Sequence, residues 1–551
     1  MTDTATGPLP RQHMGLVLTA SAAGTVFEWY DFFVFGSLTA IISKHFYAGA
    51  GNTQSYILTL LTFAAGFLVR PLGAIVFGHF GDRTGRKRTF LVTISIMGLA
   101  TFAMGLLPDY SVIGAVAPYT LVAMRVLQGF AVGGEYGGAA IYVAEHSDAG
   151  RRGTATGWIQ ASATIGLFLA LSLVLITRTE MGEKAFSDWG WRIPFLISLV
   201  LLAVSLWIRL KLQESPVYRK MREDGRGSQA PLREAFLQWH NLRIVLMALF
   251  STLMAQGVVW YTAQFYTQVF LERVVKVEPR VVNFLVLTVT FLSAPLHMFF
   301  AWLSDQIGRK PVILFGLALS TVSIIPGFQM LTEAVNPALV AATASAPVTV
   351  IADPGNCSFQ FDPLGKSKFV TSCDIAKSTL ANAGVPYRNE AAPSGTVAHV
   401  RIGSVGVTSF EGGSLDAETL ANDRKVFEAR LKGTLARAGY RPSADSNAVN
   451  APLAITLLLV FIVAASALYG PQAAALVELF PTRIRYSALS VPYHIGVGWF
   501  GGLLPTVVFA VNVASGNVYA GLWYPVIVAG FSFVVALFFL PETRGRNIEA
   551  D

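Results

Sequence analysis

The sequence carries little charge, and this shortage excludes a soluble protein. Asp, Glu, Lys and Arg make up 13% of the 551 residues, whereas a typical soluble domain has about 25%. Apolar residues make up 53%, so a soluble fold would lack the polar surface needed to cover its core. The same composition is ordinary for a chain that lies mostly within a lipid bilayer, and this is the first expectation for the protein.

Other absences narrow the class further. Residues 1–13 are polar with one Arg, and the apolar stretch that follows is too long and too aromatic for a cleaved signal peptide. The net charge is +8, but Lys and Arg form short clusters instead of one basic face, so no nucleic-acid partner is expected. The polar region 338–451 has no nucleophile elbow, metal-ligand cluster or phosphate loop. The sequence therefore predicts neither an enzyme nor a metal or cofactor site.

Long apolar stretches fill most of the chain. Twelve of them reach the roughly 20 residues that a helix needs to cross about 30 Å of hydrocarbon, and in lipid the backbone groups of such a segment must be satisfied within a helix. The sequence therefore predicts an all-α membrane protein with twelve transmembrane helices. The expected spans are 15–40, 56–80, 89–107, 115–144, 153–177, 191–211, 243–270, 281–303, 311–331, 453–477, 487–512 and 519–540.

Basic residues between the spans indicate the orientation. If the N-terminus is cytoplasmic, the short cytoplasmic segments hold 21 Lys and Arg and the short outer segments hold seven. Positive charge concentrates in the cytoplasmic loops of membrane proteins. We therefore expect a multi-pass membrane protein with both termini in the cytoplasm.

An internal repeat defines the architecture. The segment Gly78-His-Phe-Gly-Asp-Arg-Thr-Gly-Arg-Lys87 recurs 223 residues later as 301–310, and Glu145 recurs 333 residues later as Glu478. The offsets differ by 110 residues, which indicates an insertion between spans nine and ten of two related six-helix halves. The expected parts are an N-terminal half (1–212), a cytoplasmic central loop (213–240), helices 7–9 (241–337), an outer insertion (338–451), and helices 10–12 with a short tail (452–551).

The insertion has the composition of a soluble domain. It holds 11 Lys and Arg and 10 Asp and Glu. Residues 348–352 and 397–402 predict strands, and 374–383 and 416–438 predict helices, so a small α/β domain is expected. Both cysteines, Cys357 and Cys373, lie in it, and on the oxidising side of a membrane such a pair favours a disulfide over two free thiols. The second helix has apolar residues at helical spacing, namely Leu420, Val426, Phe427, Leu431 and Leu435.

The repeated loop segment combines glycines with charged residues at fixed positions. Gly78 permits close helix approach, Gly85 permits a tight turn, and Asp82 can pair with a cation or with the N-terminus of a helix. One copy alone could be a solvated run of charge, but two copies at matched positions argue against that. The residues concerned are Gly78, Asp82, Arg83, Gly85, Arg86, Lys87, Asp305, Gly308, Arg309 and Lys310, with Glu145, Arg152, Glu478, Arg483 and Arg485 after spans four and ten.

This pattern resembles the loop motif of the major facilitator superfamily, together with Arg125-Val-Leu-Gln-Gly129 in span four and Pro541-Glu-Thr-Arg-Gly545 after span twelve. Three further segments are similar to the metabolite:H+ symporter family within it, whose members transport citrate, 2-oxoglutarate, shikimate, and proline or betaine. The resemblance covers nearly all of the spans but not residues 338–451. Its three segments are Glu28-Trp-Tyr-Asp-Phe32, Gly133-Gly-Glu-Tyr-Gly-Gly138 and Glu478-Leu-Phe-Pro-Thr-Arg-Ile-Arg-Tyr486.

The resemblance implies a location in the bacterial cytoplasmic (inner) membrane, and a mechanism as well as a fold. Two six-helix bundles would rock about a central site, driven by proton uptake, and the loop motif would switch the conformation at the cytoplasmic side through Asp82 and Arg86 and through Asp305 and Arg309. The second copy departs from the motif with Ala in place of Gly at position 301 and Gln in place of Arg at position 306. Its part in gating is therefore less well defined by the motif than that of the first copy.

Two acids lie inside the first expected span. Glu28 and Asp31 are three residues apart and so share a face of a helix. A carboxylate in the bilayer is costly, and removal from water favours its protonated form, which suits a group that takes up and releases a proton. We interpret both acids as candidates for proton or substrate coupling; the alternative is a structural ion pair with Arg70 or Arg125.

Other polar residues inside the spans are candidates for the substrate cavity. Arg125 could hold a substrate carboxylate or tune a nearby acid, or it could belong to a structural network, and Arg70 is assigned to structure. His494 could titrate near neutral pH or serve as a neutral hydrogen-bonding group. Glycines spaced by four residues in span four indicate close helix packing. The remaining candidates are Tyr30, Glu135, Tyr136, Gln160, Tyr261 and Tyr493.

Together these features predict a monomeric, proton-coupled symporter that imports a small organic acid, with the proton as its coupling ion. A symporter of a compatible solute such as proline or betaine is the first alternative. A transporter-like receptor that senses a ligand through the insertion is the second. The insertion could cover the outer mouth, bind an unknown partner, or be tolerated in a permissive loop.

Overall fold

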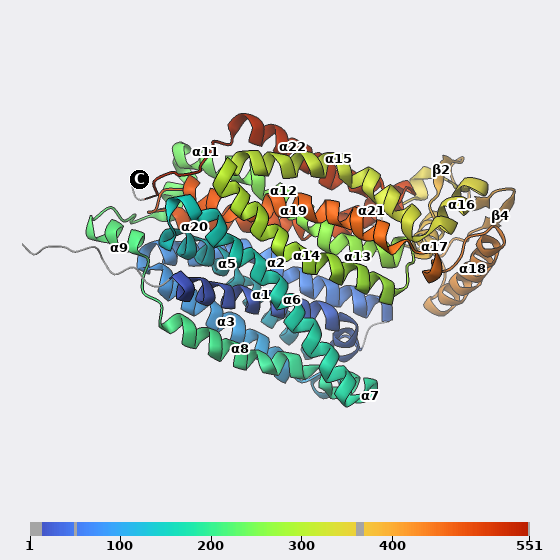
Figure 1. Cartoon of the computed structure of the whole chain (residues 1–551). Coiled ribbons are helices and arrows are strands. Elements are labelled where there is room, and N and C mark those ends of the chain that lie inside the picture. The colour runs from blue at the N-terminus through green and yellow to red at the C-terminus, as the bar shows by residue number, and fades with distance from the viewer. Residues whose placement is uncertain (1–13, 49–51, 360–368, 549–551) are drawn as a thin grey trace, which may run out of the picture.

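The computed structural model describes residues 14–48, 52–359 and 369–548. Long helices lie side by side in a bundle (Figure 1). Each of the twelve predicted spans corresponds to a helical segment with similar bounds. Ten helical segments in this part of the chain are long and apolar enough to cross a membrane, and α1 and α2 have 33 residues each. The all-α membrane fold predicted from the sequence is therefore confirmed.

The long helices have the following bounds. The N-terminal half contains α1 (Met14–Phe46), α2 (Asn52–Thr84), α3 (Arg86–Leu106), α5 (Val116–His146), α6 (Arg152–Met181) and α8 (Arg192–Leu210). The C-terminal half contains the seventh span (Trp239–Val274), α14 (Pro279–Ile307), α15 (Arg309–Val335), α19 (Ala451–Leu479), the eleventh span (Arg485–Ser515) and α22 (Trp523–Phe539). Short helices in the connections include α4 (Tyr110–Ile113), α7 (Glu183–Ala185), α9 (Pro216–Glu223) and α10 (Pro231–Leu237).

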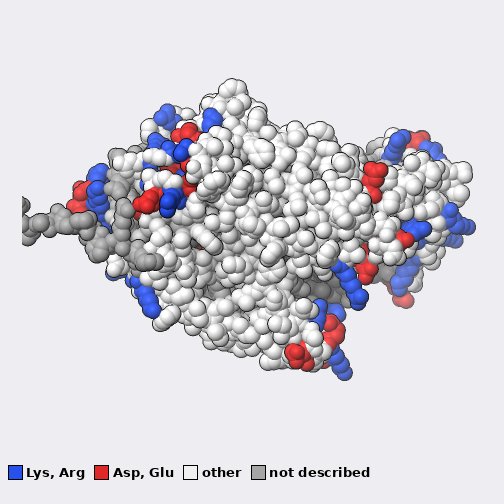
Figure 2. Space-filling view, viewed as in Figure 1, with Lys and Arg blue, Asp and Glu red and all other residues white. Residues whose placement is uncertain are grey.

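Charge is separated along the bundle. Lys, Arg, Asp and Glu gather at its two ends, and an uncharged belt lies between them on the face shown in Figure 2. The last described residues of the chain lie at the end that carries α9, and the insertion lies at the opposite end (Figure 1). This distribution suits a bundle whose middle is surrounded by hydrocarbon.

Spans seven and eleven are irregular. The seventh consists of three helices, α11 (Trp239–Ala248), α12 (Met254–Tyr261) and α13 (Thr267–Val269). The π-helical turns η3 (Leu249–Leu253) and η4 (Thr262–Tyr266) join these helices, and a third, η5 (Phe270–Val274), ends the span. The eleventh consists of α20 (Arg485–Tyr493), the π-helical η8 (His494–Gly501) and α21 (Leu504–Ser515). The two spans cross closely, because a Cβ on Gly257 would lie 2.8 Å from the carbonyl oxygen of Gly496. Such π-helical turns are frequent at functional sites.

The insertion forms a four-stranded sheet in the order β2-β1-β3-β4, backed by two helices. Strand β1 (Val348–Ala352) pairs in parallel with β2 (Arg388–Ala391) and antiparallel with β3 (His399–Ile402), which pairs antiparallel with β4 (Val405–Thr408). The helices are α17 (Ser372–Ala383) and α18 (Ala417–Arg437), and α16 (Pro337–Ser345) leads into the domain. The predicted strands and helices are confirmed, and β2 and β4 are additional.

Two details of the insertion test the sequence expectations. Cys357 and Cys373 form the expected disulfide, with Cα atoms 5.2 Å apart. Val426 was expected on the buried face of α18, but its side chain is 52% exposed. Phe427 and Leu431 instead pack into the core of the domain, because a residue next to a core position on a helix points about 100° away from it.

Candidate functional site

One buried and one partly buried ion pair lie between α1, α2 and α5. Arg125 on α5 donates to Asp31 on α1 at 3.5 Å, and Gln128, one turn along α5, donates to the same carboxylate. Arg70 on α2 lies 4.0 Å from Glu28. Both acids that we predicted as coupling candidates are thus paired with arginines, Glu28 with Arg70 and Asp31 with Arg125. These are the two arginines that the sequence analysis named as partners for a structural ion pair. Arg70 belongs to the same site, although the sequence pattern assigned it to structure.

These pairs border a small cavity of about 20 Å³, which has room for about one water molecule. Its close walls come from the packing of α2 against α5, where a Cβ on Gly129 would lie 2.1 Å from the carbonyl oxygen of Gly66. The glycine spacing in span four is therefore used for close helix contact, as predicted. The cavity is lined by Glu28, Asp31, Phe32, Gly66, Phe67, Arg70, Arg125, Gln128, Gly129 and Val132.

A row of tyrosines joins the two halves beside this cavity. The rings of Tyr136 on α5 and Tyr493 on α20 are stacked, with centroids 3.8 Å apart. Gln160 on α6 donates to the Tyr136 hydroxyl at 2.9 Å, and Tyr493 is hydrogen bonded to Tyr469 on α19. Glu28 interacts electrostatically with these three tyrosines. Three of the predicted cavity residues therefore lie together at the interface of the halves.

Several buried polar atoms around this row have no hydrogen-bond partner within the described protein. They include the side-chain oxygens of Gln160 and Gln256, both amide atoms of Gln472, and Nε2 of His494. Buried polar groups are normally bonded. A solute with several hydrogen-bonding groups could meet these atoms, of which Gln256 and Gln472 were not among the leading sequence candidates.

Aromatic side chains at the level of the cavity join α1 and α2 to the seventh span. Trp29 packs against Trp260 on α12 with ring centroids 5.0 Å apart, and Phe32 packs against Phe265 at 5.6 Å. Tyr261, another predicted candidate, packs against Phe67 at 6.2 Å. Residues from both halves therefore build this aromatic cluster.

Two predicted candidates lie elsewhere in the N-terminal half. The Tyr30 hydroxyl donates to the Pro194 carbonyl at 2.5 Å, which fixes α1 against α8. Glu135 does not line the cavity; it forms a buried ion pair with Arg209 and accepts the Thr93 hydroxyl at 2.9 Å. Arg209 was counted among the cytoplasmic basic residues, but it is 0% exposed. Its place at the end of an apolar run made it look like an interfacial residue.

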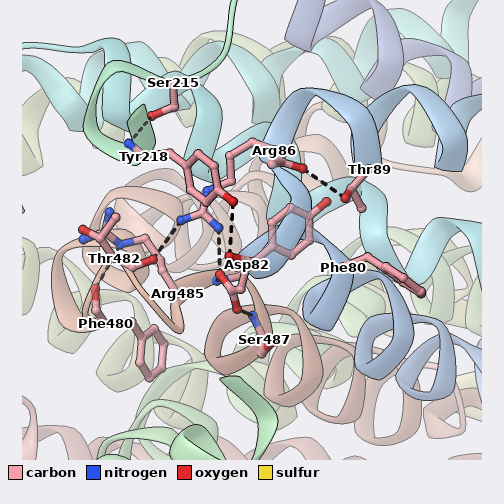
Figure 3. Close-up of polar contacts among 12 residues, drawn as sticks. Phe80, Asp82, Arg86, Thr89, Ser215, Tyr218, Phe480, Thr482, Arg485 and Ser487 are labelled. Carbon is pink, nitrogen blue, oxygen red and sulfur yellow. Dashed lines mark hydrogen bonds and ion pairs between the residues drawn. The ribbon is translucent and has the colours of Figure 1, made fainter. Parts of the chain in front are cut away.

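The predicted gate residues form a lock between the halves (Figure 3). The Asp82 carboxylate at the end of α2 accepts the Arg86 guanidinium at 2.7 Å and the backbone N–H groups of Tyr486 and Ser487 on α20 at 3.1 and 2.9 Å. Arg86 also donates to the Thr482 carbonyl at 2.9 Å. An acid of one half therefore caps the N-terminus of a helix of the other half, where a negative charge is favourable.

Glu145 joins the same lock. It accepts Arg485 from the C-terminal half at 2.7 Å and lies 3.5 Å from Arg86 of its own half. All three side chains are buried. One carboxylate shared by two arginines neutralises charge in a place where unpaired charge is costly.

The second copy of the motif builds a second lock in the same way. Asp305 accepts Arg309 at 2.6 Å and the backbone N–H groups of Gly153 and Thr154 on α6 at 2.9 and 2.7 Å. Glu478 lies 3.2 Å from Arg309 and 3.6 Å from Arg152 of the other half. The second lock therefore has the same contacts as the first with the roles of the two halves exchanged, in agreement with the sequence repeat.

The departures from the motif in the second copy are accommodated. Gln306 and Arg83 are both exposed, so this exchange changes no buried contact. Ala301 is buried and packs against Gly157 on α6, where an added Cβ would lie 2.6 Å from the Ala301 Cβ. The glycine that allows close helix packing is therefore on α6 in this lock. Arg483 takes no part in either lock and pairs instead with Glu234 on α10 at 3.1 Å.

Two further acids complete the locks: Glu214, which the sequence analysis did not single out, and Glu542, which belongs to the Pro541–Gly545 motif but was given no role. Glu214 accepts the backbone N–H of Arg86 at 3.1 Å, and Glu542 accepts that of Arg309 at 2.9 Å, so each caps the helix that follows its motif. Burial raises the pKa of Glu214 above its ordinary value of 4.5, although the N–H groups that it accepts act in the opposite sense. A third repeat could have revealed them, because Leu212-Gln-Glu-Ser215 recurs as Leu540-Pro-Glu-Thr543.

The lysines and glycines of the two motifs also correspond. Lys87 donates to the Leu210 carbonyl at 3.1 Å and Lys310 to the Leu537 carbonyl at 2.9 Å, so each binds near the C-terminal end of the last helix of its half. Gly85 and Gly308 have φ of 119° and 107°, values that L side chains rarely adopt. Both motifs therefore require glycine at the turn.

Comparisons with known proteins agree with this geometry. Residues 16–230 and 435–550 match the family described as sugar (and other) transporter, and residues 139–353 match MFS/sugar transport protein. The shikimate transporter of Escherichia coli K12 is 36% identical over 317 residues, which cover 56% of this chain and 71% of that protein. The proline/betaine transporter of the same strain is 33% identical over 326 residues, which cover 57% of this chain and 64% of that protein, slightly less than two thirds.

The fold is also found in a solved structure. The proton:xylose symporter XylE bound to 6-bromo-6-deoxy-D-glucose superimposes with a TM-score of 0.57 at 16% identity. The match covers 97% of this chain and 98% of that one. At this level of identity the likeness supports the arrangement of the helices.

Proposed function

Because the chain belongs to the sugar (and other) transporter family of the major facilitator superfamily, we propose that it is a proton-coupled symporter that imports a small organic acid by alternating access. The observation that carries the proposal is the pairing of Glu28 with Arg70 and of Asp31 with Arg125 around one small cavity. Acids and bases buried in the membrane interior are functional candidates because they are costly to keep there.

The ion pairs couple a proton to a carboxylate in the following way. A substrate carboxylate that reaches the cavity competes with Asp31 or Glu28 for its arginine, since guanidinium groups bind carboxylates through two parallel hydrogen bonds. The displaced acid, buried and without its cation, then favours the protonated form. Proton and substrate are thus taken up together, and the proton is the coupling ion.

The two locks are the gate on the cytoplasmic side. They consist of charges from both halves, so inward opening must break them, and the aromatic contacts of α1 with span seven must break on outward opening. We place both termini in the cytoplasm and the insertion outside the cytoplasmic membrane, in accord with the basic residues beside the locks. The protein acts as a monomer, because each half supplies the other with its lock partners.

Uptake into liposomes tests the proposal. Purified protein is reconstituted, an inward proton gradient is imposed, and uptake of labelled citrate, 2-oxoglutarate and shikimate is compared with that of proline and betaine, with and without a protonophore. We expect accumulation of a carboxylate that the protonophore abolishes. Preferential accumulation of betaine or proline would favour the compatible-solute alternative, and accumulation of any solute against its gradient would exclude a pure receptor.

One substitution separates coupling from binding. Asp31→Asn should abolish accumulation driven by the pH gradient but retain exchange of labelled for unlabelled substrate, because the amide cannot take up the proton. Asp224→Asn is the matched control, since Asp224 is 42% exposed on the central loop and pairs only with Arg226 among the described residues. Accumulation by Asp31→Asn at the wild-type level would contradict the assignment of Asp31.

Labelling from outside the cell tests the orientation. Lys425→Cys on α18 and Arg226→Cys on the central loop place single thiols at exposed positions at opposite ends of the bundle. A membrane-impermeant maleimide added to intact cells should label the first and spare the second. The reverse pattern would invert the proposed orientation.

A further inference from the structure

The insertion enters and leaves the bundle at one place. The backbone N–H of Asn450, before α19, donates to the Ala334 carbonyl at the end of α15 at 2.9 Å. A domain joined only there could swing freely, because the two chain crossings lie side by side. Further contacts therefore decide whether the insertion is mobile or fixed.

The insertion caps the end of span eleven. The Tyr387 hydroxyl donates to the Val513 carbonyl, and its backbone N–H donates to Gly516 at 2.9 Å. Asn389 of β2 donates to the carbonyls of Ala514 and Ser515 at 3.2 and 2.9 Å. The last carbonyls of a helix have no partner within it, so the insertion supplies the bonds that α21 lacks.

A cation strengthens the same contact. Lys377 on α17 donates to the Ala514 carbonyl at 3.4 Å, and a positive charge is favourable at the C-terminus of a helix. Lys377 and Tyr387 are both buried. These two side chains are therefore shielded from water, whereas Asn389 lies at the exposed edge of the contact.

The insertion also holds the end of span seven. The Ala444 backbone N–H donates to the Lys276 carbonyl at 2.8 Å, and Lys276 has φ of 62°. A Cβ on Gly384, at the end of α17, would lie 2.2 Å from the Val274 carbonyl. Lys276 is a non-glycine residue in the left-handed region, a strained conformation that persists only where surrounding contacts impose it.

These contacts join two spans that also meet at the central site. Spans seven and eleven carry the π-helical turns, cross at Gly257 and Gly496, and present Tyr261 and Tyr493 to the interface of the halves. All the hydrogen bonds between the described residues of the insertion and the bundle reach the C-terminal half. In Figure 1 the insertion lies at the end of the bundle, beside the label of α21.

We propose that the insertion is a brace that fixes the outer ends of spans seven and eleven to each other and moves with the C-terminal half as one body. It is thus neither a clamp across the two halves nor a tethered appendage. The movement rests on the alternating access proposed above, whereas the bracing contact does not.

Distances between spin labels test both statements. Single thiols at Lys425→Cys on α18, Arg280→Cys at the start of α14 and Glu183→Cys on α7 are combined in pairs, since both native cysteines are in the disulfide. Each pair is measured in the otherwise wild-type chain and with both locks weakened by Asp82→Asn and Asp305→Asn. We expect the 425–183 and 280–183 distances to change while the 425–280 distance stays the same. A change in the 425–280 distance overturns the brace.

The bracing contact is tested without any conformational change. Asn389→Ala removes two hydrogen bonds to the end of α21 and should widen the 425–280 distance distribution. Arg401→Ala, on the neighbouring strand β3 and paired only with the exposed Glu390 among the described residues, is the control and should leave it narrow. An Asn389→Ala distribution as narrow as that of the control overturns the proposal. If the 280–183 distance stays the same when the locks are weakened, the proposed movement of the two halves is contradicted. The comparison of Asn389→Ala with Arg401→Ala still tests the bracing contact in that case.

Discussion

The Asp82 carboxylate of the N-terminal half accepts the backbone N–H of Ser487, in the first turn of α20 of the C-terminal half, at 2.9 Å. Its counterpart Asp305 accepts the backbone N–H groups of Gly153 and Thr154 in the opposite direction. Each half therefore holds the other by the same chemistry, an acid set against the positive end of a helix.

The first prediction concerns these two acids. Asp82→Asn keeps the shape of the side chain but removes its charge, which weakens three bonds to groups of positive character. Bonds to charged groups contribute about 1.5–3 kcal/mol each, so we expect the cytoplasmic side to open more often. Labelling of a thiol at the Ser490→Cys position, which is buried behind the lock, should become faster by an order of magnitude or more.

The paired lock provides the check on this prediction. Asp305→Asn should increase the same labelling rate, although Asp305 belongs to the second copy of the motif. The double variant should exceed either single one, because both locks join the same two bodies. An increase for Asp82→Asn with none for Asp305→Asn would mean that the second lock does not take part in closure.

The second prediction concerns the buried pair of Glu135 and Arg209. Arg209→Met leaves Glu135 buried without its cation, and breaking a buried ion pair costs about 3–5 kcal/mol. We expect a large fall in the melting temperature in detergent. Adding Glu135→Gln should recover much of it, because no charge then remains unpaired. Arg178→Met is the control, since Arg178 and Glu183 are 41% and 71% exposed and such pairs contribute about 0–1 kcal/mol.

The third prediction concerns the turn between α2 and α3. Gly85→Ala introduces a side chain at φ of 119° and places its Cβ 2.3 Å from the Glu214 carboxylate. Backbone strain of about 1–3 kcal/mol and loss of the Glu214 cap should lower the melting temperature. Gly150→Ala should have little effect, because no other atom lies within 4 Å of the added Cβ. Equal effects of the two would contradict the strain argument.

The fourth prediction concerns acid stability of the insertion. The backbone N–H groups of Gly395 and Gly355 hold the pKa of Asp353 below its ordinary value of 3.8, so the folded domain binds fewer protons than the unfolded chain near that pH. The stabilisation is present above about pH 4 and is lost as the pH falls further. The protection of insertion peptides against hydrogen exchange, measured in the whole protein and relative to the intrinsic exchange rate at each pH, should fall accordingly.

Asp353→Asn is the variant that isolates this effect. Its amide oxygen can still accept a hydrogen bond but does not titrate, so this protection should depend less on pH below 4. Some dependence should remain, because the cap of α18, Asp416, also has a lowered pKa through the bonds that it accepts from Thr419. An unchanged pH profile would show that the loop bonds of Asp353 do not couple to folding.

The fold could be predicted from the sequence because membrane spans obey a single strong constraint. A run of about 20 apolar residues must be helical in lipid. The two repeat offsets led us to expect an extra domain between spans nine and ten, and the four-stranded sheet lies in that part of the chain. Strand β2 escaped prediction because all four of its residues are exposed, so it has no apolar alternation. It is held instead by its pairing with β1 and by the bonds from Asn389 to the end of span eleven.

The site was predictable only in part. The repeat led to Asp82 and Asp305, because a duplicated acid is visible in the sequence. Their partners on the other half are backbone N–H groups, which any residue can provide, and therefore leave no signal. Arg209 lies at the end of an apolar run, where a buried and an interfacial arginine read alike. Pairings across the bundle, such as Glu28 with Arg70, depend on helix packing that spacing along the chain does not reveal.

The separation in sequence of the lock partners has a consequence for biosynthesis. Tyr486 follows Asp82 by 404 residues, and at about 5–20 residues per second the ribosome needs roughly 20–80 s to make them. During that interval the acid can be neutralised by Arg86 of its own half, but the helix that it caps does not yet exist. The first half must therefore wait in the membrane in an unlocked state, and closure is among the last steps of assembly.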